Sequence, residues 1–286
     1  MARVTVGDAL RSAGRRLQPV GETGALDASR LLEYVTGRDR AGLIVTADVL
    51  LDAASRARFE ELVARRERGE PVAYIVGDAG FYGRTFVVDE RVLVPRPESE
   101  HVVEAVIDDL RARRKTAGII ADIGTGSGAL GITLACELPE LAVYATDISP
   151  AALSVARRNA ARNGVFQRCT FVAGDLLAPL KVFGERLDAV VANLPYIPAR
   201  DVPVAPNPAG FEPRIALDGG PDGLDLYRRL LRQLETVAAA DAAVFLEGAP
   251  GTIEPLAALV EQMFPAAFIE IGEDYSGLER FVSFVR

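Results

Sequence analysis

Hydrophobic positions in the first part of the chain follow a helical period. Between residues 5 and 69, apolar side chains recur at spacings of three and four, as from Leu31 to Val35 and from Phe59 to Leu62. Such spacings place the apolar side chains on one face of a helix. We therefore expect a small helical domain at this end of the chain, over residues 1–71.

The pattern changes after Gly69 and Pro71, two residues that end a helix. Residues 72–94 read VAYIVGDAGFYGRTFVVDERVLV, in which β-branched and aromatic residues surround glycines. This composition is typical of a hairpin or a short sheet. We expect residues 72–95 to form a β-hairpin connector.

Beyond residue 96 apolar strands alternate with helices. A helix is expected at about 98–113, and later helices lie between short apolar runs. Such alternation predicts an α/β domain over residues 96–286, with a doubly wound, Rossmann-like sheet. The expected strands are 118–123, 142–147, 169–175, 187–193, 242–247, 268–271 and 281–285.

One connection in this domain is unusually long. Residues 199–213 carry several prolines and no clear element. Loops of this length in a compact domain are usually functional. The segment is a candidate lid that faces the substrate.

Composition narrows the function further. The chain has 286 residues, of which 49% are hydrophobic, and neither a signal-peptide pattern nor an apolar run long enough to cross a bilayer. We expect a cytoplasmic protein with no membrane partner. The net charge of −8 argues against a protein that holds nucleic acid by neutralising phosphates, so no direct nucleic-acid substrate is expected. The two cysteines are expected to be reduced core thiols, and a single histidine excludes a histidine-based metal site.

A glycine-rich turn follows the first strand of this domain. Gly126, Gly128 and Gly131 match the GxGxxG pattern of dinucleotide-binding proteins, and Asp147 lies about where a ribose-binding acid is required. Taken alone, the match leaves an NAD-dependent dehydrogenase open.

The longer run, DxGxGxG from Asp122 to Gly128, resembles the class I methyltransferases, which use S-adenosyl-L-methionine. A glycine loop lets the backbone pass close to the methionine part of this cofactor. Asp147 can accept hydrogen bonds from both ribose hydroxyls, and Asp175 can accept one from the adenine amino group. The predicted cofactor-binding residues are Asp122, Gly124, Thr125, Gly126, Ser127, Gly128, Asp147, Ile148, Asp175, Leu176 and Asn193.

A second motif ends the fourth strand. Asn193, Leu194, Pro195 and Tyr196 are the predicted catalytic residues. Proline at 195 favours an extended backbone at Leu194, so that its carbonyl can converge with the side-chain oxygen of Asn193. Two such acceptors can hold a planar amino group, from a primary amide or from adenine, and Tyr196 can stack on it.

With these motifs in place, the chain resembles the peptide chain release factor glutamine methyltransferases over most of its length. The matching blocks are RRERGEPVAYIVG at 65–77, FYG at 81–83, VLVPRPESE at 92–100, FEPRIALDGG at 211–220 and DGLDLYR at 222–228. The resemblance implies methyl transfer from S-adenosyl-L-methionine to a glutamine amide nitrogen in the Gly-Gly-Gln loop of peptide chain release factors. It also implies that the helical domain helps to dock the release factor.

Three positions depart from the family pattern. Leu194 gives Asn-Leu-Pro-Tyr where the family has Asn-Pro-Pro-Tyr, and the form found here is familiar from ribosomal RNA adenine dimethyltransferases. Leu176 replaces a residue that is often aromatic, and a glutamine often found just beyond Glu247 is absent. Two alternatives therefore stay open: an adenine amino-group methyltransferase that acts on ribosomal RNA, and a binding module without catalysis.

Overall fold

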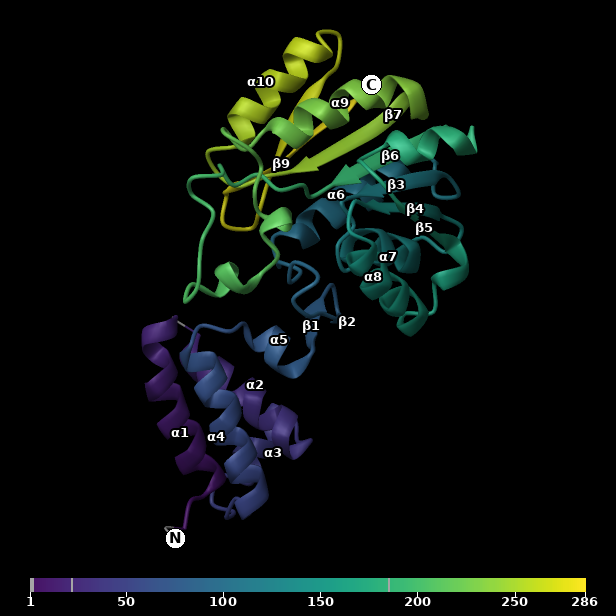
Figure 1. The fold of residues 1–286 in the computed structure, drawn as a ribbon. Coiled ribbons are helices and arrows are strands. Elements are labelled where there is room, and N and C mark those ends of the chain that lie inside the picture. The colour runs from purple at the N-terminus through teal and green to yellow at the C-terminus, as the bar shows by residue number, and fades with distance from the viewer. Residues whose placement is uncertain (1–2, 22, 185) are drawn as a thin grey trace. The chain divides into compact units, whose positions relative to one another are not determined.

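The computed structural model describes residues 3–21, 23–184 and 186–286, which form two compact units (Figure 1). The helical unit contains the chain up to Asp78 and the segment Pro203–Phe211. The sheet unit contains Ala79–Val202 and Glu212–Arg286. Each unit has hydrophobic core residues of its own.

The helical unit confirms the helical period read from the sequence. Its core holds Leu17, Leu31, Phe59 and Leu62, all fully buried. Side chains at three helix starts accept hydrogen bonds from backbone N–H groups, which would otherwise lack partners. The helices are α1 (Val6–Leu17), α2 (Gly24–Thr36), α3 (Arg40–Val45), α4 (Ala53–Glu67) and α5 (Val72–Val76).

Arginines of α4 pair with acids inside this unit. Arg66 is buried, and its Nε lies 2.7 Å from Oδ2 of Asp27 on α2. Arg65 pairs with Glu70, and Arg58 lies 2.6 Å from Glu61. A substantial part of the arginine-rich stretch is therefore engaged in holding the unit together.

The segment predicted as a lid is divided between the units. Residues 203–211 group with the helices, and Pro208–Phe211 forms a 3₁₀ turn. Within the helical unit, Gly69 has a φ of +92°, and a Cβ there would lie 1.8 Å from the Pro206 carbonyl oxygen. Only glycine fits at this contact. The sequence did not show that this segment packs against the residues around Gly69.

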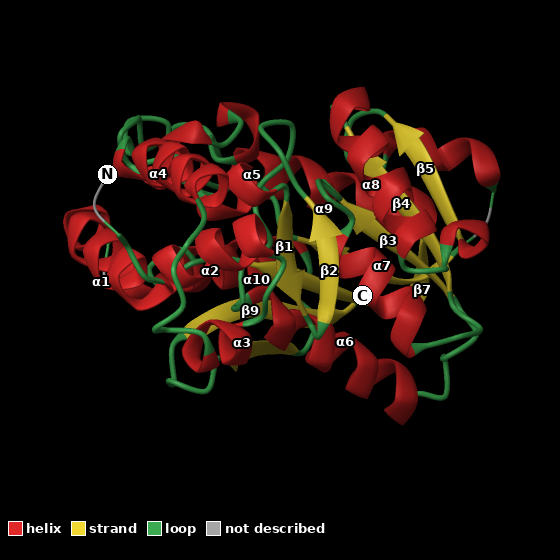
Figure 2. Ribbon diagram, turned by 90° about the horizontal axis from the view of Figure 1, so that it is seen from below, coloured by secondary structure: helices red, strands yellow, loops and turns green. Residues whose placement is uncertain are grey.

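The expected hairpin is present, but it begins later than residue 72. Strands β1 (Asp78–Phe81) and β2 (Arg84–Val87) pair in a two-stranded sheet (Figure 2). Val72–Val76, which precede Gly77 and β1, form the short helix α5. Pro71 starts this helix by accepting hydrogen bonds at its carbonyl, and Gly77, with a φ of +84°, ends it. The strand preference of the β-branched residues is outweighed here by Pro71 and Gly77, which fix the two ends of a helix.

The sheet unit confirms the doubly wound α/β fold. Its seven strands lie in the order β5-β4-β3-β6-β7-β9-β8; those from β5 to β7 are parallel, and β9 is antiparallel to both neighbours. The strands are β3 (Ile119–Ile123), β4 (Ala142–Asp147), β5 (Cys169–Ala173), β6 (Leu187–Ala192), β7 (Ala238–Glu247), β8 (Ile269–Glu273) and β9 (Glu279–Val285).

Helices cover both faces of this sheet, as Figure 1 shows. On one face, Ile120 and Val191 pack with α6 (Ser99–Ala112), α7 (Ala129–Glu137) and α8 (Pro150–Arg162). On the other face, Ala121 and Val190 pack with α9 (Asp225–Val237) and α10 (Ile253–Met263). Because both faces are buried, the parallel strands are apolar throughout rather than alternating.

Three further observations concern the described part of the chain. Among the described residues, no helix is long and apolar enough to span a bilayer, and no cluster of acids, histidines and cysteines could hold a metal ion. Cys136 and Cys169 are free thiols, as predicted. Burial raises the pKa of the Cys169 thiol to about 12, so this cysteine is an inert core residue.

Candidate active site

The site lies where the strand order of the sheet reverses. The chain runs from β3 to β4 and β5 on one side, then returns to β6 on the other side of β3. Ile123 at the end of β3 is in register with Ala192 at the end of β6. Loops that leave neighbouring parallel strands here separate and open a crevice, where ligands bind in such sheets. The glycine loop and the tetrapeptide form its two sides.

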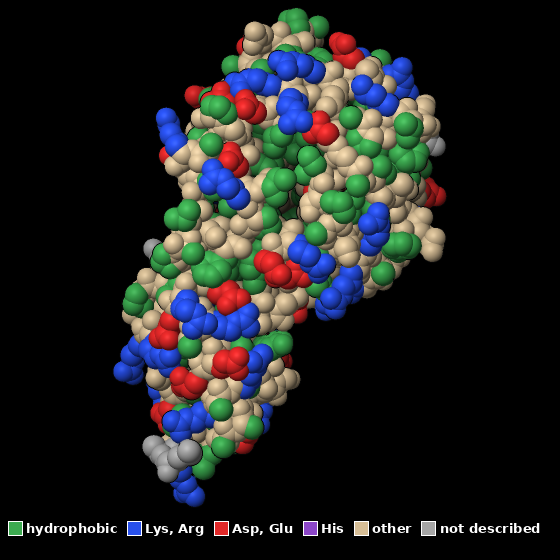
Figure 3. Space-filling model, in the orientation of Figure 1, with side chains coloured by type: hydrophobic (Ala, Val, Ile, Leu, Met, Phe, Trp, Pro, Cys, Tyr) green, Lys and Arg blue, Asp and Glu red, His purple; other side chains and the backbone are tan. Residues whose placement is uncertain are grey.

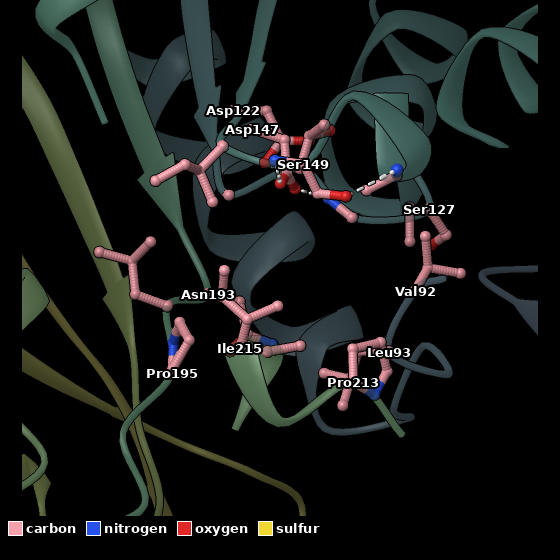
Figure 4. A pocket seen from close by; sticks show the side chains of 18 of the residues that line it. Val92, Leu93, Asp122, Ser127, Asp147, Ser149, Asn193, Pro195, Pro213 and Ile215 are labelled. Atoms are coloured by element: carbon pink, nitrogen blue, oxygen red, sulfur yellow. Dashed lines mark hydrogen bonds between the residues drawn. The ribbon is translucent and has the colours of Figure 1, made fainter. Parts of the chain in front are cut away.

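A cavity of about 560 Å³ occupies this crevice, within the range of about 300 to 1,000 Å³ common for small-molecule sites. Figure 3 shows a hollow in this face of the sheet unit, with hydrophobic side chains around it. In Figure 4, Asp122 and Asp147 lie at one end and Leu93 and Pro213 at the other, with Asn193 between them. Further lining residues are Phe81, Val92, Arg96, Ser99, Thr125, Ser127, Ile148, Asp175, Leu176, Ile215 and Arg229.

The glycine loop is held by the carboxylate of Asp122. Gly124, Gly126 and Gly128 all have positive φ, between +54° and +85°, which side chains other than glycine rarely tolerate. Asp122 Oδ2 accepts hydrogen bonds from Thr125 Oγ1 at 2.6 Å and from the Gly131 N–H at 2.9 Å. Burial raises the pKa of Asp122 to about 6, against the effect of these two bonds. Asp122 therefore fixes the conformation of the glycine loop through these two hydrogen bonds.

Asp147, at the end of β4, links the loop to the next helix. Its Oδ2 accepts from the Gly126 N–H at 2.9 Å, and its Oδ1 accepts from the Ser149 N–H at 2.8 Å. Each carboxylate oxygen has a second lone pair. The carboxylate that lines the cavity can therefore accept two more hydrogen bonds.

Asp175 follows β5 and forms an ion pair. Its Oδ2 lies 2.5 Å from Nη2 of Arg229 on α9, and both side chains line the cavity. Leu176, with a φ of +51°, is buried beside them. This end of the cavity thus offers an acceptor that is already paired and an apolar surface.

Asn193 stands at the opposite side, directly after β6. Its Nδ2 donates to Glu247 Oε1 at 2.7 Å and lies 3.3 Å from Ser99 Oγ. Among the described residues, none donates a hydrogen bond to its Oδ1. The amide nitrogen therefore has partners in the protein, while the oxygen remains available.

The backbone of Leu194 is held by Tyr227 of α9. The Leu194 N–H donates to Tyr227 Oη at 3.2 Å, and that hydroxyl donates to the carbonyl of Glu247. The Leu194 carbonyl also lies 3.3 Å from Tyr227 Oη. One hydroxyl has a single proton, and the Glu247 carbonyl is the closer acceptor. The Leu194 oxygen therefore keeps lone pairs for another donor.

Two segments far apart in sequence meet in the cavity wall. The buried carboxylate of Glu212 accepts from the Val94 N–H at 3.1 Å and pairs with Arg96. Burial raises the pKa of Glu212, while Arg96 opposes the shift. Pro213, next to Glu212, and Leu93, next to Val94, line the wall together (Figure 4).

Comparison with known proteins matches both units. Residues 8–77 match the family model described as the PrmC N-terminal domain, and residues 102–204 match the methyltransferase small domain. A protein of Moorella thermoacetica named release factor glutamine methyltransferase is 46% identical over 229 residues, 80% of each chain. A protein of Bradyrhizobium diazoefficiens with the same name is 39% identical and covers 99% of this chain and 93% of its own. This chain belongs to the release factor glutamine methyltransferase family.

Solved structures agree with this methyltransferase fold. The hMettl16 catalytic domain, solved with a 3′UTR hairpin, has a TM-score of 0.54 at 16% identity and covers 71% of this chain and 76% of its own. The human methyltransferase 10 domain containing protein has a TM-score of 0.51 at 16% identity and covers 71% of this chain and 90% of its own. At such identities the likeness concerns the fold alone.

In this member of the release factor glutamine methyltransferase family, twelve of the fourteen predicted site residues line one cavity. The other two, Gly128 and Tyr196, do not. Gly128 is the N-cap of α7, where its φ of +85° favours glycine. Tyr196 is largely buried, which raises its pKa to about 12, and it packs against the core between the sheet, α9 and α10. Tyr196 therefore does not line the cavity in which a stacked substrate would lie.

The residues that hold the site residues of this methyltransferase in place were not predicted from the sequence. Ser99, Glu212 and Tyr227 all fall in blocks that carried the resemblance, but nothing in the sequence gave them partners. Asn159 of α8 is fully buried and joins the Val87 backbone of the hairpin to the Ser127 carbonyl. A polar residue in the apolar period of α8 was the available signal for Asn159.

Proposed function

We propose that this protein transfers a methyl group from S-adenosyl-L-methionine to the side-chain amide nitrogen of glutamine in the Gly-Gly-Gln loop of peptide chain release factors. The names of the curated relatives support the substrate. One observation of this chain carries the proposal: Asn193 lines the cavity with its amide nitrogen bound to Glu247 and its oxygen free to accept. A primary amide of glutamine is a donor that fits such an acceptor.

The residues at the other end of the cavity fit the cofactor. The positive-φ glycines leave the loop without side chains, and a Cβ at Gly124 would come within 2.9 Å of Leu194 Cδ2. Asp147 has lone pairs for two ribose hydroxyls, Asp175 has an acceptor for an amino group, and Leu176 offers an apolar face. When bound, S-adenosyl-L-methionine supplies an electrophilic methyl group on a positively charged sulfur.

Positioning is the main task that these residues perform. The lone pair of an amide nitrogen is shared with the carbonyl, as the rotational barrier of about 18 to 20 kcal/mol in peptide amides shows. Asn193 Oδ1 and the Leu194 carbonyl can each accept one of the two N–H groups and hold the nitrogen in line for attack. Orientation of this kind contributes about 7 to 11 kcal/mol in favourable systems.

The reaction balances without a protein base. With the cofactor bound, the amide nitrogen would take the methyl group as the carbon–sulfur bond is lost, and the alkylated nitrogen would release its proton to water. Both acceptors stabilise the positive charge that develops on nitrogen. Glu247, the carboxylate bonded to Asn193, is not placed as a base, because it contacts the amide nitrogen of Asn193 and does not line the cavity.

Mass spectrometry of the acceptor tests this function. Purified release factor with its Gly-Gly-Gln loop and a ribosomal RNA fragment are each incubated with the enzyme and isotope-labelled S-adenosyl-L-methionine. We expect one labelled methyl group on the loop glutamine and none on adenine. A release factor in which that glutamine is replaced by alanine is the control. Label on adenine alone would show that Leu194 marks an RNA methyltransferase instead.

A further inference from the structure

Three polar side chains form a closed group behind the tetrapeptide. Glu247, the last residue of β7, accepts from Asn193 Nδ2 at 2.7 Å and from Ser99 Oγ at 2.9 Å, both at Oε1. Ser99 is the first residue of α6 and lies 3.3 Å from the same Asn193 nitrogen. Glu247 and Ser99 are both buried. The group therefore joins β7, α6 and the end of β6 at one point.

This group decides which way the Asn193 amide faces. The oxygen and the NH₂ group of an asparagine amide have nearly the same size, so packing alone does not distinguish the amide from its flipped orientation. An ionised carboxylate only accepts hydrogen bonds, so it requires the nitrogen of Asn193 to face it. The reversed orientation would present two N–H donors to the substrate, which itself offers N–H donors.

We propose that Glu247 is a positioning residue for methyl transfer, because it fixes the Asn193 amide with its oxygen toward the substrate. The inference rests on the proposed function, in which Asn193 must be an acceptor. Glu247 acts through Asn193 and lies outside the cavity lining. Methyl transfer at Asn193, directly after β6, thus depends on the Glu247 carboxylate at the end of β7.

The surroundings of Glu247 give this role a pH dependence. Burial raises the pKa of Glu247 to about 7, and the charge of Glu98 raises it further, while Ser99, Arg280 and Arg96 act in the opposite direction. The hydroxyls of Tyr196 and Tyr227 also face this region, and the pKa of each is raised by burial and by Glu247. Oε2 of Glu247 is buried, and no described residue donates to it. The ionised form, which orients Asn193 most strongly, is therefore gained as pH rises through about 7.

Glu247→Gln is the variant that tests this role. Glutamine keeps the size of the side chain, but it can pair with Asn193 in either orientation, so the constraint on the amide is lost. We expect kcat to fall roughly 10-fold to 100-fold, less than the loss of the acceptor itself, with cofactor affinity unchanged. The rise of activity through about pH 7 should also disappear. Glu137→Gln, at a partly buried glutamate paired with Arg84, is the matched control and should keep full activity.

A double-mutant cycle separates positioning from a general structural role. If Glu247 acts through Asn193, Glu247→Gln should cause no further loss in an Asn193→Ala background. Ser99→Ala, a second variant, should lower kcat several-fold in the wild type and have no effect in that background. The inference is overturned if Glu247→Gln keeps the wild-type kcat and pH profile, or if it slows Asn193→Ala by the same factor.

The acceptor assay keeps this inference separate from the proposed function. If wild-type enzyme leaves the release factor unlabelled and methylates adenine, the proposed function is wrong. The same cycle is then measured on the RNA fragment, because an adenine amino group also needs an acceptor at Asn193. Non-additive losses there would still support the role of Glu247, and additive losses would overturn it.

Discussion

The two sides of the cavity are built at the ends of neighbouring strands, yet their polar groups are satisfied in different ways. At the glycine loop, Asp122 and Asp147 accept hydrogen bonds from the loop itself and from the helix starts that follow. At the tetrapeptide, Asn193 Oδ1 and Glu247 Oε2 receive no hydrogen bond from any described residue.

The difference separates binding from chemistry. A loop that is bonded to its own carboxylates keeps its shape before the cofactor arrives, so little ordering is required on binding. Asn193 Oδ1, in contrast, lines the cavity without a donor from any described residue, so a donor on the substrate can pair with it. Under the proposed function, the glycine loop is therefore preformed for the cofactor, whereas the Asn193 acceptor is completed by the substrate.

Removal of the acceptor at the reacting side should have the largest effect. We expect Asn193→Ala to lower methyl transfer roughly 100-fold to 1,000-fold, as for other single groups that stabilise developing charge. Cofactor affinity should change little, and single-turnover kinetics with calorimetry would measure both. Asn163→Ala, at the end of α8, is the control. Equal losses in affinity and rate would mean that Asn193 holds the cofactor instead.

The pH dependence of stability distinguishes the buried carboxylate of the reacting side from the others. Burial in the folded protein raises the pKa of Glu247 from its ordinary value of 4.5 to about 7. Between these values the folded state holds a proton that the unfolded state has released. The stability of the wild type relative to Glu247→Gln should therefore fall as pH rises from about 4.5 to 7, by about 3 kcal/mol in total. Urea unfolding of both proteins at several pH values measures this difference in stability. A difference that stays constant with pH would show that the pKa of Glu247 is not raised in the folded protein.

Asp147 provides the corresponding test at the cofactor side. Asp147→Ala should weaken binding of S-adenosyl-L-methionine by roughly 1.5 to 3 kcal/mol, the range for hydrogen bonds to charged groups. Isothermal calorimetry measures this loss, with Asp108→Ala on the exposed face of α6 as the control. Binding of NAD but not of S-adenosyl-L-methionine to the wild type would contradict the methyltransferase assignment of this side.

The smallest effect is expected at Leu194, the residue that departs from the family tetrapeptide. Leu194→Pro keeps the carbonyl but removes the N–H that donates to Tyr227. We expect a loss of about 1 kcal/mol in stability, as for one neutral hydrogen bond, with methyl transfer within a few-fold of wild type. Thermal unfolding and a rate measurement together check this. A large loss of rate would mean that the leucine side chain itself positions the substrate.

Much of the fold followed from periodicity alone. All seven strands of the large sheet were expected within a few residues of their observed bounds. For the five parallel strands the reason is that buried parallel strands are short apolar runs between helices. Helix α5 was missed because its β-branched residues favour a strand, whereas its boundaries at Pro71 and Gly77 decided the outcome.

The site was predictable where one segment of chain provides all of its parts. The glycine loop and the tetrapeptide are local motifs, and both line the cavity. Partnerships between distant residues were not visible: Asn193 and Glu247 are 54 positions apart, and Val94 and Glu212 are 118 apart. Tyr196, predicted as a stacking surface, packs partly buried against the core and does not line the cavity, so its stacking role stays a prediction.

The grouping of Pro203–Phe211 with the helical unit means that the backbone passes between the units three times. A shortened chain that begins after residue 78 would leave these nine residues without their packing partners, although the next residue, Glu212, anchors the cavity wall. Loss of activity on such truncation would then report damage to the wall as well as loss of docking. The docking role is better tested by surface substitutions at exposed Ile44 and Val45 on α3. The same connection also makes one backbone segment serve two purposes, because Pro203–Phe211 belongs to the helical unit while the residue that follows it, Glu212, holds the wall of the cavity.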